Sequence, residues 1–141
     1  MEKEFIPYEE ALALKELGFD EPCFRYYWLT NGDDGKLNFM GENSGVKTNS
    51  NLEWASKNTL KGLQDCNFCT APLYQQAFRW FKKEHKMKFY IREDIWNHWC
   101  GVEILTDKEF DNEYVELDEY ETYEEAELAC LKKLIEIVKT K

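Results

Sequence analysis

The feature that most constrains the fold is a proline-started helix pattern in the middle of the chain, residues 71–83, APLYQQAFRWFKK. Pro72 suits the first turn of a helix, because an N–H at that position would have no intrahelical partner. The apolar residues that recur at helical spacing are Leu73, Tyr74, Ala77, Trp80 and Phe81. The spacing predicts a core-packed helix from Pro72 to Lys86, with Thr70 upstream as its cap.

Three strand patterns follow this helix. From Met87 to Arg92, apolar and polar residues alternate, as they do when one face of a strand is buried. Two short segments separate this strand from two others, at Cys100–Leu105 and at Glu113–Asp118. We expect a connecting turn at residues 94–99 and a polar turn at residues 106–112. Consecutive strands with short links predict an antiparallel meander, in which Lys88, Tyr90 and Arg92 point away from the core.

Helix signals also stand near both ends of the chain. Thr122 begins a helix that runs to Lys139, and Glu125 completes a capping box with it. Near the N-terminus, Pro7 begins a short helix that Gly18 ends, because glycine readily takes the left-handed conformation. The aromatic residues 23–29 then predict a strand that extends the same sheet unit.

Together these elements predict an α+β fold in a single domain, residues 1–141. Its parts are a small antiparallel sheet of three to five strands, two main helices packed on one face and a short N-terminal helix. The aromatic fraction of 16% supplies ample area for a core. Residues 30–70 are rich in Gly, Asn and Ser, and they predict a mobile loop or an insertion with one strand, 36–40.

Charge and cysteine usage limit the classes of function. The formal net charge is −10, which disfavours general nucleic-acid binding and allows a basic protein partner or a bound cation. No apolar run approaches the roughly 20 residues that a membrane span needs. The five cysteines are odd in number and the N-terminus is charged, so we expect a cytoplasmic protein with reduced thiols and no membrane association.

A basic strip is the first candidate binding site. Its members are Arg79, Lys82, Lys83, Lys86, Lys88 and Arg92. With Tyr90, the cations Arg79, Lys83 and Arg92 would hold a phosphate-containing small molecule. The alternative is that the strip pairs with the acidic tract of residues 103–127, within the fold or across a dimer. That tract would itself be a mimic of nucleic acid, a binding surface for a basic partner, or a solvated sheet face and helix start, and the solvated face is the favoured interpretation.

Cys66 and Cys69 form the sharpest local motif. Two thiolates at this spacing can reach one tetrahedral zinc ion. Two more ligands would have to come from His85, His98 or Cys100. Because a second such pair is missing, ordinary thiols are the favoured interpretation, and we expect no metal and no cofactor. No signature of a catalytic triad is present, so no catalytic residue is predicted.

The C-terminal helix carries apolar residues outside its core face. Leu128 and Ile135 lie one heptad apart, roughly opposite that face. They predict either a homodimer contact or burial of the helix on two sides.

Two resemblances bear on function. Residues 51–60 resemble the segment that follows the active site in HNH-type homing endonucleases. That family binds its metal through preceding histidines, and this chain has no histidine before His85, so the resemblance does not imply a nuclease. Three blocks, residues 6–23, 71–81 and 122–135, resemble small uncharacterised proteins of Bacteroidetes phages, prophages and gut metagenomes. This second resemblance implies a phage accessory or host-interaction role, without an established activity or catalytic residues.

We therefore expect a non-enzymatic, phage-type accessory protein that binds a host or phage macromolecule, such as a protein, in the host cytoplasm. The alternative is a protein that binds or sequesters a nucleotide-type ligand through Arg79, Lys83, Tyr90 and Arg92. A third hypothesis is a zinc module or metal-dependent enzyme built on Cys66 and Cys69.

Overall fold

The computed structural model describes residues 4–29, 37–40, 48–49, 67–105 and 112–140. Over these residues it contains α-helices and two antiparallel sheets of three strands each, so the predicted α+β class is confirmed. The chain forms two compact units, which we call the N-terminal unit (Phe5–Leu73) and the C-terminal unit (Tyr74–Lys141). Each is described by itself.

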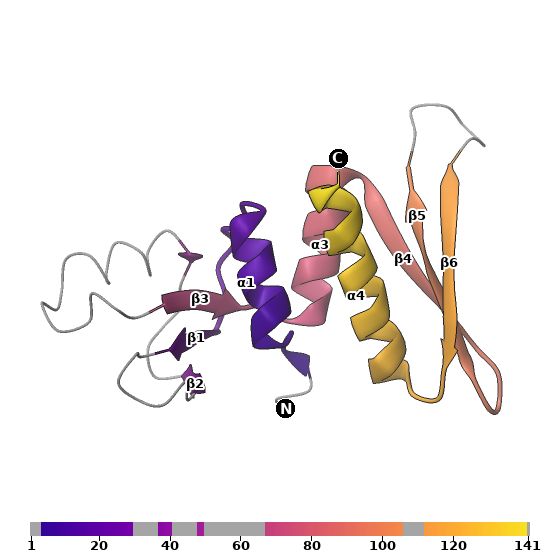
Figure 1. Ribbon diagram of the computed structural model, residues 1–141, viewed down its shortest axis with the longest axis horizontal. Helices are drawn as coiled ribbons and strands as arrows, with labels where there is room; N and C mark the ends of the chain where they lie inside the picture. Colours follow the sequence, from indigo (N-terminus) through magenta and orange to yellow (C-terminus); the bar gives the residue numbers. More distant parts are fainter. Residues whose placement is uncertain (1–3, 30–36, 41–47, 50–66, 106–111, 141) are drawn as a thin grey trace, which may run out of the picture. The chain divides into compact units, whose positions relative to one another are not determined.

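The C-terminal unit is an α-β-β-β-α arrangement. Its elements in chain order are α3 (Tyr74–His85), β4 (Met87–Glu93), β5 (His98–Ile104), β6 (Glu113–Tyr120) and α4 (Tyr123–Lys139). The strands pair in the order β4-β5-β6, and α3 and α4 lie side by side on one face of the sheet (Figure 1). This confirms the predicted three-stranded meander with both main helices on one face.

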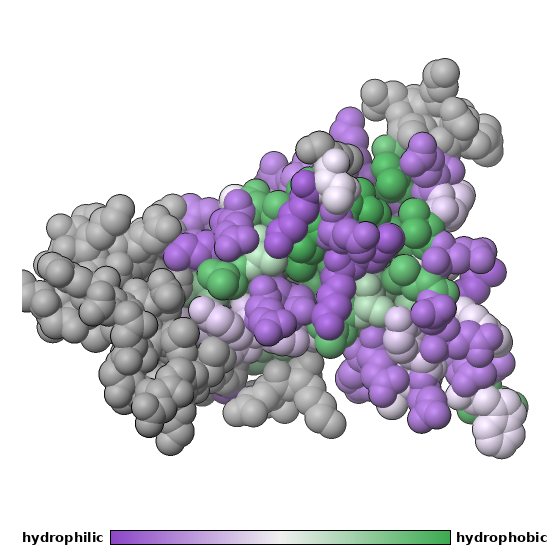
Figure 2. All heavy atoms as spheres, in the orientation of Figure 1, coloured by the Kyte–Doolittle hydropathy of each residue, from purple (hydrophilic) through white to green (hydrophobic). Residues whose placement is uncertain are grey.

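The core of this unit lies between the helix pair and the sheet. Phe81 of α3, Val102 of β5 and Leu134 of α4 have no exposed surface. The ring of Phe78 stacks on that of Phe89 in β4, with the centroids 3.7 Å apart. Figure 2 shows the hydrophobic residues gathered between these layers and hydrophilic residues on the outside of the unit. The aromatic pattern of α3 is therefore a core pattern, as its spacing predicts.

The start of α4 has the predicted cap. The hydroxyl of Thr122 accepts a hydrogen bond from the backbone N–H of Glu125 at 3.2 Å. This bond satisfies one of the N–H groups that have no partner within the helix. It also fixes the point at which the chain leaves β6 and turns back over the sheet.

The N-terminal unit contains α1 (Tyr8–Glu16), β1 (Arg25–Leu29), β2 (Leu37–Met40) and β3 (Asn67–Ala71). Gly18 ends α1 as predicted, at a φ of 101°. The N–H of Phe19 donates to the carbonyl of Leu14 at 2.9 Å, and that of Gly18 donates to Lys15 at 3.1 Å. These two bonds form a Schellman motif, which needs the left-handed conformation at its glycine.

The strands of the N-terminal unit correct three predictions. They pair in the order β2-β1-β3, so the aromatic strand belongs to a second sheet and does not extend the sheet that α3 and α4 cover. Thr70 lies inside β3 and is not the cap of α3, because pairing of β3 with β1 commits this residue to the sheet. Within residues 30–70 the predicted strand is confirmed as β2. The loop prediction is wrong for residues 67–70, which belong to β3, and most of the other residues that it covers are outside the described part of the chain.

A buried asparagine connects two elements of this unit. Asn49 is 5% exposed. Its Nδ2 donates to the carbonyl of Phe19 at 2.7 Å, and its Oδ1 accepts from the backbone N–H of Thr70 at 2.9 Å. One amide side chain thus holds the end of α1 against β3 and pairs two backbone groups away from water.

None of the helices in the described part of the chain has both the length and the apolar character needed to cross a membrane.

Candidate functional site

One face of the β4-β5-β6 sheet carries no helix of its unit (Figure 1). A hollow of about 880 Å³ lies on this side of the sheet. We call its polar and aromatic floor the open face, and its residues are Tyr90, Arg92, Trp99, Glu103, Tyr114 and Glu116. Strand alternation brings these side chains together, because successive residues point to opposite sides of a sheet and the helices already cover the other side.

Gly101 shapes the centre of the open face. It lies opposite Tyr90 on β4 and opposite Glu116 on β6. A Cβ atom on Gly101 would lie 2.6 Å from Cζ of Tyr90 and 2.6 Å from the carbonyl oxygen of Val115. Only glycine leaves room for the tyrosine ring to lie across the middle strand, and that ring makes an edge contact with Tyr114 at 6.5 Å.

Carboxylates surround these rings. Glu103 accepts hydrogen bonds from the amide of Asn112 at 2.8 Å and from the hydroxyl of Tyr114 at 3.3 Å. The negative charge of Glu103 raises the pKa of Tyr114. Burial, followed by the nearby carboxylate of Glu116, raises the pKa of Tyr90. Both phenols therefore stay protonated at neutral pH and offer neutral hydrogen-bond donors beside negative charge.

The turn between β4 and β5 projects apolar side chains into solvent. Ile95 is 89% exposed and Trp96 is 78% exposed. The carboxylate of Asp94 accepts hydrogen bonds from the backbone N–H groups of Trp96 and Asn97, each at 2.7 Å, and the N–H of Asp94 donates to the carbonyl of Asn97 at 3.0 Å. Those two N–H donors lower the pKa of Asp94. We call this turn, Asp94–Asn97, the hairpin tip.

Glu119 of β6 joins the hairpin tip to the sheet. Its carboxylate accepts from the indole N–H of Trp99 at 2.6 Å and from the amide of Asn97 at 3.0 Å. Trp99 is 38% exposed. The indole of Trp99 is therefore held on the open face by a hydrogen bond, and the backbone that carries Trp96 is held by the bonds to Asp94. Such a turn loses less backbone freedom on binding than a loose loop would.

The four residues predicted to bind a phosphate-containing ligand, Arg79, Lys83, Tyr90 and Arg92, lie in different places. Tyr90 and Arg92 lie together on the open face, with the guanidinium carbon of Arg92 5.9 Å from the Tyr90 ring centroid. Arg79 of α3 lines a separate hollow. Lys83 is exposed, and its ammonium is 4.0 Å from Glu84. The four residues do not form one site.

The sequence reasoning missed the hairpin tip. From the sequence, residues 94–99 are predicted only as a connecting turn. The available signal was composition, since Ile95 and Trp96 stand where turns normally carry Gly, Asn, Asp or Ser. A turn that needs only Asp94 for its backbone bonds leaves its central side chains available for contact.

The residues predicted as zinc ligands belong to different strands. Cys69 lies in β3 of the N-terminal unit, whereas His98 and Cys100 lie in β5 of the C-terminal unit. Cys66 is outside the described residues. Among the residues that the structure describes, no three His, Cys, Asp or Glu side chains are grouped as a metal ion would require.

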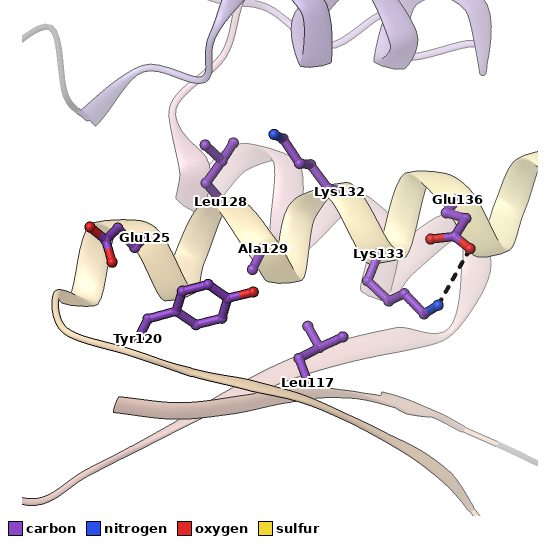
Figure 3. A pocket seen from close by; sticks show the side chains of 8 residues that line it. All are labelled: Leu117, Tyr120, Glu125, Leu128, Ala129, Lys132, Lys133 and Glu136. Carbon is purple, nitrogen blue, oxygen red and sulfur yellow. Dashed lines mark hydrogen bonds and ion pairs between the residues drawn. The ribbon is translucent and has the colours of Figure 1, made fainter. Parts of the chain in front are cut away.

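A groove of about 490 Å³ runs between α4 and β6. In Figure 3, Leu117 and Tyr120 form its strand side, Ala129 and Lys133 point toward them, and Lys133 pairs with Glu136 at 3.4 Å. Leu128 also borders this groove and is half-buried. Ile135 is 6% exposed, which agrees with the alternative of burial on two sides of α4, and a dimer contact stays a prediction.

The described cysteines are buried thiols. Burial raises the pKa of Cys23 to about 11 and that of Cys69 to about 12. For Cys100 and Cys130, burial again raises the pKa as the largest cause. Since the thiolate is the reactive form, these side chains are poor nucleophiles at neutral pH.

The thiols predict a loss of stability in alkali. Above a pH of about 9 the unfolded chain releases thiol protons that folded Cys69 retains, so the unfolded state binds fewer protons and stability falls as pH rises toward 12. From this thiol we expect the free energy of unfolding to fall by at most about 1.4 kcal/mol for each pH unit. Urea unfolding between those pH values should show a shallower slope for Cys69→Ala than for the wild type. Equal slopes would contradict the assignment.

No protein-family model matches this chain, and neither the curated proteins nor the solved structures contain a match to it.

Proposed function

We propose that this chain is a non-enzymatic binding protein that docks a basic protein partner on its hairpin tip and open face. The observation that carries the proposal is the exposure of Ile95 and Trp96 on a turn held by hydrogen bonds. Tryptophan is enriched among the residues that dominate binding energy at protein interfaces. A fixed turn presents such an anchor at little entropic cost.

Charge identifies the partner's chemistry. Exposed Glu93 ends β4 next to the tip, and exposed Asp94 is the first residue of the tip. Glu119 of β6 bonds to the tip, and Glu103 and Glu116 lie on the open face. Arg92 is the cation that lines the same hollow. A partner segment with lysine or arginine beside an apolar residue would meet carboxylates and aromatic rings at once, gaining ion pairs and cation–π contacts.

A lipid surface is the other occupant that an exposed Trp-Ile pair would fit. The carboxylates around the tip disfavour it, because the cytoplasmic face of a membrane is negative. A protein partner also agrees with the formal net charge of −10, which speeds association with a basic surface. We therefore favour a protein.

The biological setting rests on the resemblance of residues 6–23, 71–81 and 122–135 to phage and prophage proteins. We place the protein in the host cytoplasm as a phage-type accessory factor that acts on a host or phage protein. Self-association through Leu128, which borders the groove between α4 and β6, would present two tips to one target. Such bivalent binding raises affinity without new contacts.

Selection from a random peptide library against the full chain tests the proposal. The selected peptides should be enriched in lysine, arginine and apolar residues. Trp96→Ser should weaken their affinity about 30-fold or more, as expected for loss of an anchor worth at least 2 kcal/mol. Higher salt should slow association, because screening weakens the attraction between opposite charges.

Phe24→Ser is the matched control, since this side chain is 59% exposed but belongs to the N-terminal unit. It should leave peptide affinity unchanged. Peptides without excess basic residues, or peptides that bind Trp96→Ser as well as the wild type, would refute the proposal. Trp96-dependent binding to phosphatidylcholine vesicles in place of peptides would also refute it, in favour of a lipid surface.

A further inference from the structure

A second hollow lies within the C-terminal unit, away from the hairpin tip and the open face. It has a volume of about 510 Å³, within the range of small-molecule sites. Its lining residues are Gln75, Phe78, Arg79, Lys82, Lys88, Phe89, Tyr123 and Glu127. Three elements, α3, β4 and α4, thus contribute side chains to one concave surface, which shares no residue with the open face.

Aromatic rings form one part of this hollow. Phe78 and Phe89 are stacked, with their centroids 3.7 Å apart and their planes inclined by 19°. Phe78 is almost buried, Phe89 is half-buried and Tyr123 is 38% exposed. The core therefore fixes the first ring, while the other two offer ring surface on which a planar group can stack.

Cations form another part. Arg79 and Lys82 stand on α3 and Lys88 stands on β4, and all three are exposed. A guanidinium fork matches the paired oxygens of phosphate or carboxylate, and the two ammonium groups add charge. On a chain of formal net charge −10, this grouping of three cations around one hollow is a local reversal of sign.

The remaining polar groups belong to Gln75 and Glu127. Glu127 is half-buried on α4, a different element from those that carry the cations. Burial and the neighbouring Glu124 raise the pKa of its carboxyl group. A carboxyl group there can accept a hydrogen bond from an amino group, and the amide of Gln75 can both donate and accept. An anion with an aromatic, amino-bearing ring could contact the aromatic rings, the cations and the polar groups of this lining at the same time.

We infer that this hollow binds a planar aromatic anion of nucleoside monophosphate size. The ring stacks beside Phe89 and Tyr123, and the phosphate lies against Arg79, Lys82 and Lys88. The inference does not depend on the protein partner proposed above, since the two surfaces have no lining residue in common.

Titration calorimetry of the full chain with the four common nucleoside 5′-monophosphates is the test, with the nucleosides and inorganic phosphate as separate probes. At least one monophosphate should bind saturably and more tightly than its nucleoside or phosphate alone. The double variant Arg79→Gln/Lys82→Gln should lose about tenfold or more in affinity, as expected for charge-assisted bonds. Tyr123→Ala should weaken the binding of the monophosphate and leave the binding of inorganic phosphate unchanged.

Lys83→Gln is the matched control, because Lys83 neighbours Lys82 on the same helix, is exposed and does not line the hollow. The affinity of the Lys83→Gln variant for the monophosphate should stay within about twofold of the wild-type value, as expected for an exposed charge outside the site. Lack of saturable binding by all four monophosphates would overturn the inference. So would equal effects of Lys83→Gln and the double variant, or phosphate binding as tightly as the monophosphates.

Discussion

Replacing Phe81 with alanine should remove about 3–5 kcal/mol from the free energy of unfolding. Phe81 has no exposed surface, and its ring contacts Trp80 at 5.1 Å and His85 at 5.9 Å between centroids. Alanine would leave a cavity in the layer between α3 and the sheet, which the surrounding core can fill only in part. Because domains of this size are stable by about 5–15 kcal/mol, the change is a large fraction of the whole.

Urea unfolding followed by tryptophan fluorescence measures this loss. Arg79→Ala is the control on the same helix, because Arg79 is exposed and its removal should change stability by less than about 0.5 kcal/mol. If Phe81→Ala unfolded at the same urea concentration as the wild type, the core assignment of the aromatic helix would be wrong.

The second large effect is expected at Asn49. Asn49→Leu keeps the approximate volume of the side chain and removes both of its hydrogen bonds, to the carbonyl of Phe19 and to the N–H of Thr70. Each of the two buried backbone groups that loses its partner costs about 1–3 kcal/mol, so the free energy of unfolding should fall by roughly 2–6 kcal/mol. The end of α1 and strand β3 would lose their shared contact.

Hydrogen exchange of the Thr70 amide reports on this contact directly. In the wild type the N–H donates to Asn49 and should exchange slowly, whereas Asn49→Leu should speed its exchange by orders of magnitude. Unchanged exchange together with wild-type stability would show that the two bonds contribute nothing. A loss of stability with Thr70 still protected would mean that the cost comes from packing.

The C-terminal unit could be predicted because its sequence patterns are strong and local. Thr122 caps the helix that it predicts, and the alternation from Met87 to Arg92 lies within its strand. The helix pattern after Pro72 is equally local, although α3 begins at Tyr74 and not at Pro72. The sheet of the N-terminal unit could not be predicted in the same way. Strand β3 is short, and it pairs with β1, which lies some 40 residues earlier in the chain, so the signal is not local.

The candidate sites, too, could be predicted only where the sequence signal is local. Alternation along β4 predicts that Tyr90 and Arg92 point away from the core, and both lie on the open face. Which other residues meet them depends on strand register, which places Gly101 opposite Tyr90. Helical spacing puts Arg79 on the exposed side of α3, yet only the packing of α3 against β4 and α4 surrounds it with Lys88, Phe89 and Tyr123. Pair contacts of this kind are a property of the folded chain.

The acidic tract has a consequence for self-association. Strand β6 is at one edge of its sheet over the described residues, and its exposed carboxylates are those of Glu113, Glu116, Asp118 and Glu119. An edge strand carries unpaired backbone groups that can template further strands, and like charges along it keep a second copy away. The charge that we propose attracts a basic partner would thus also oppose the pairing of two copies of the chain along this strand.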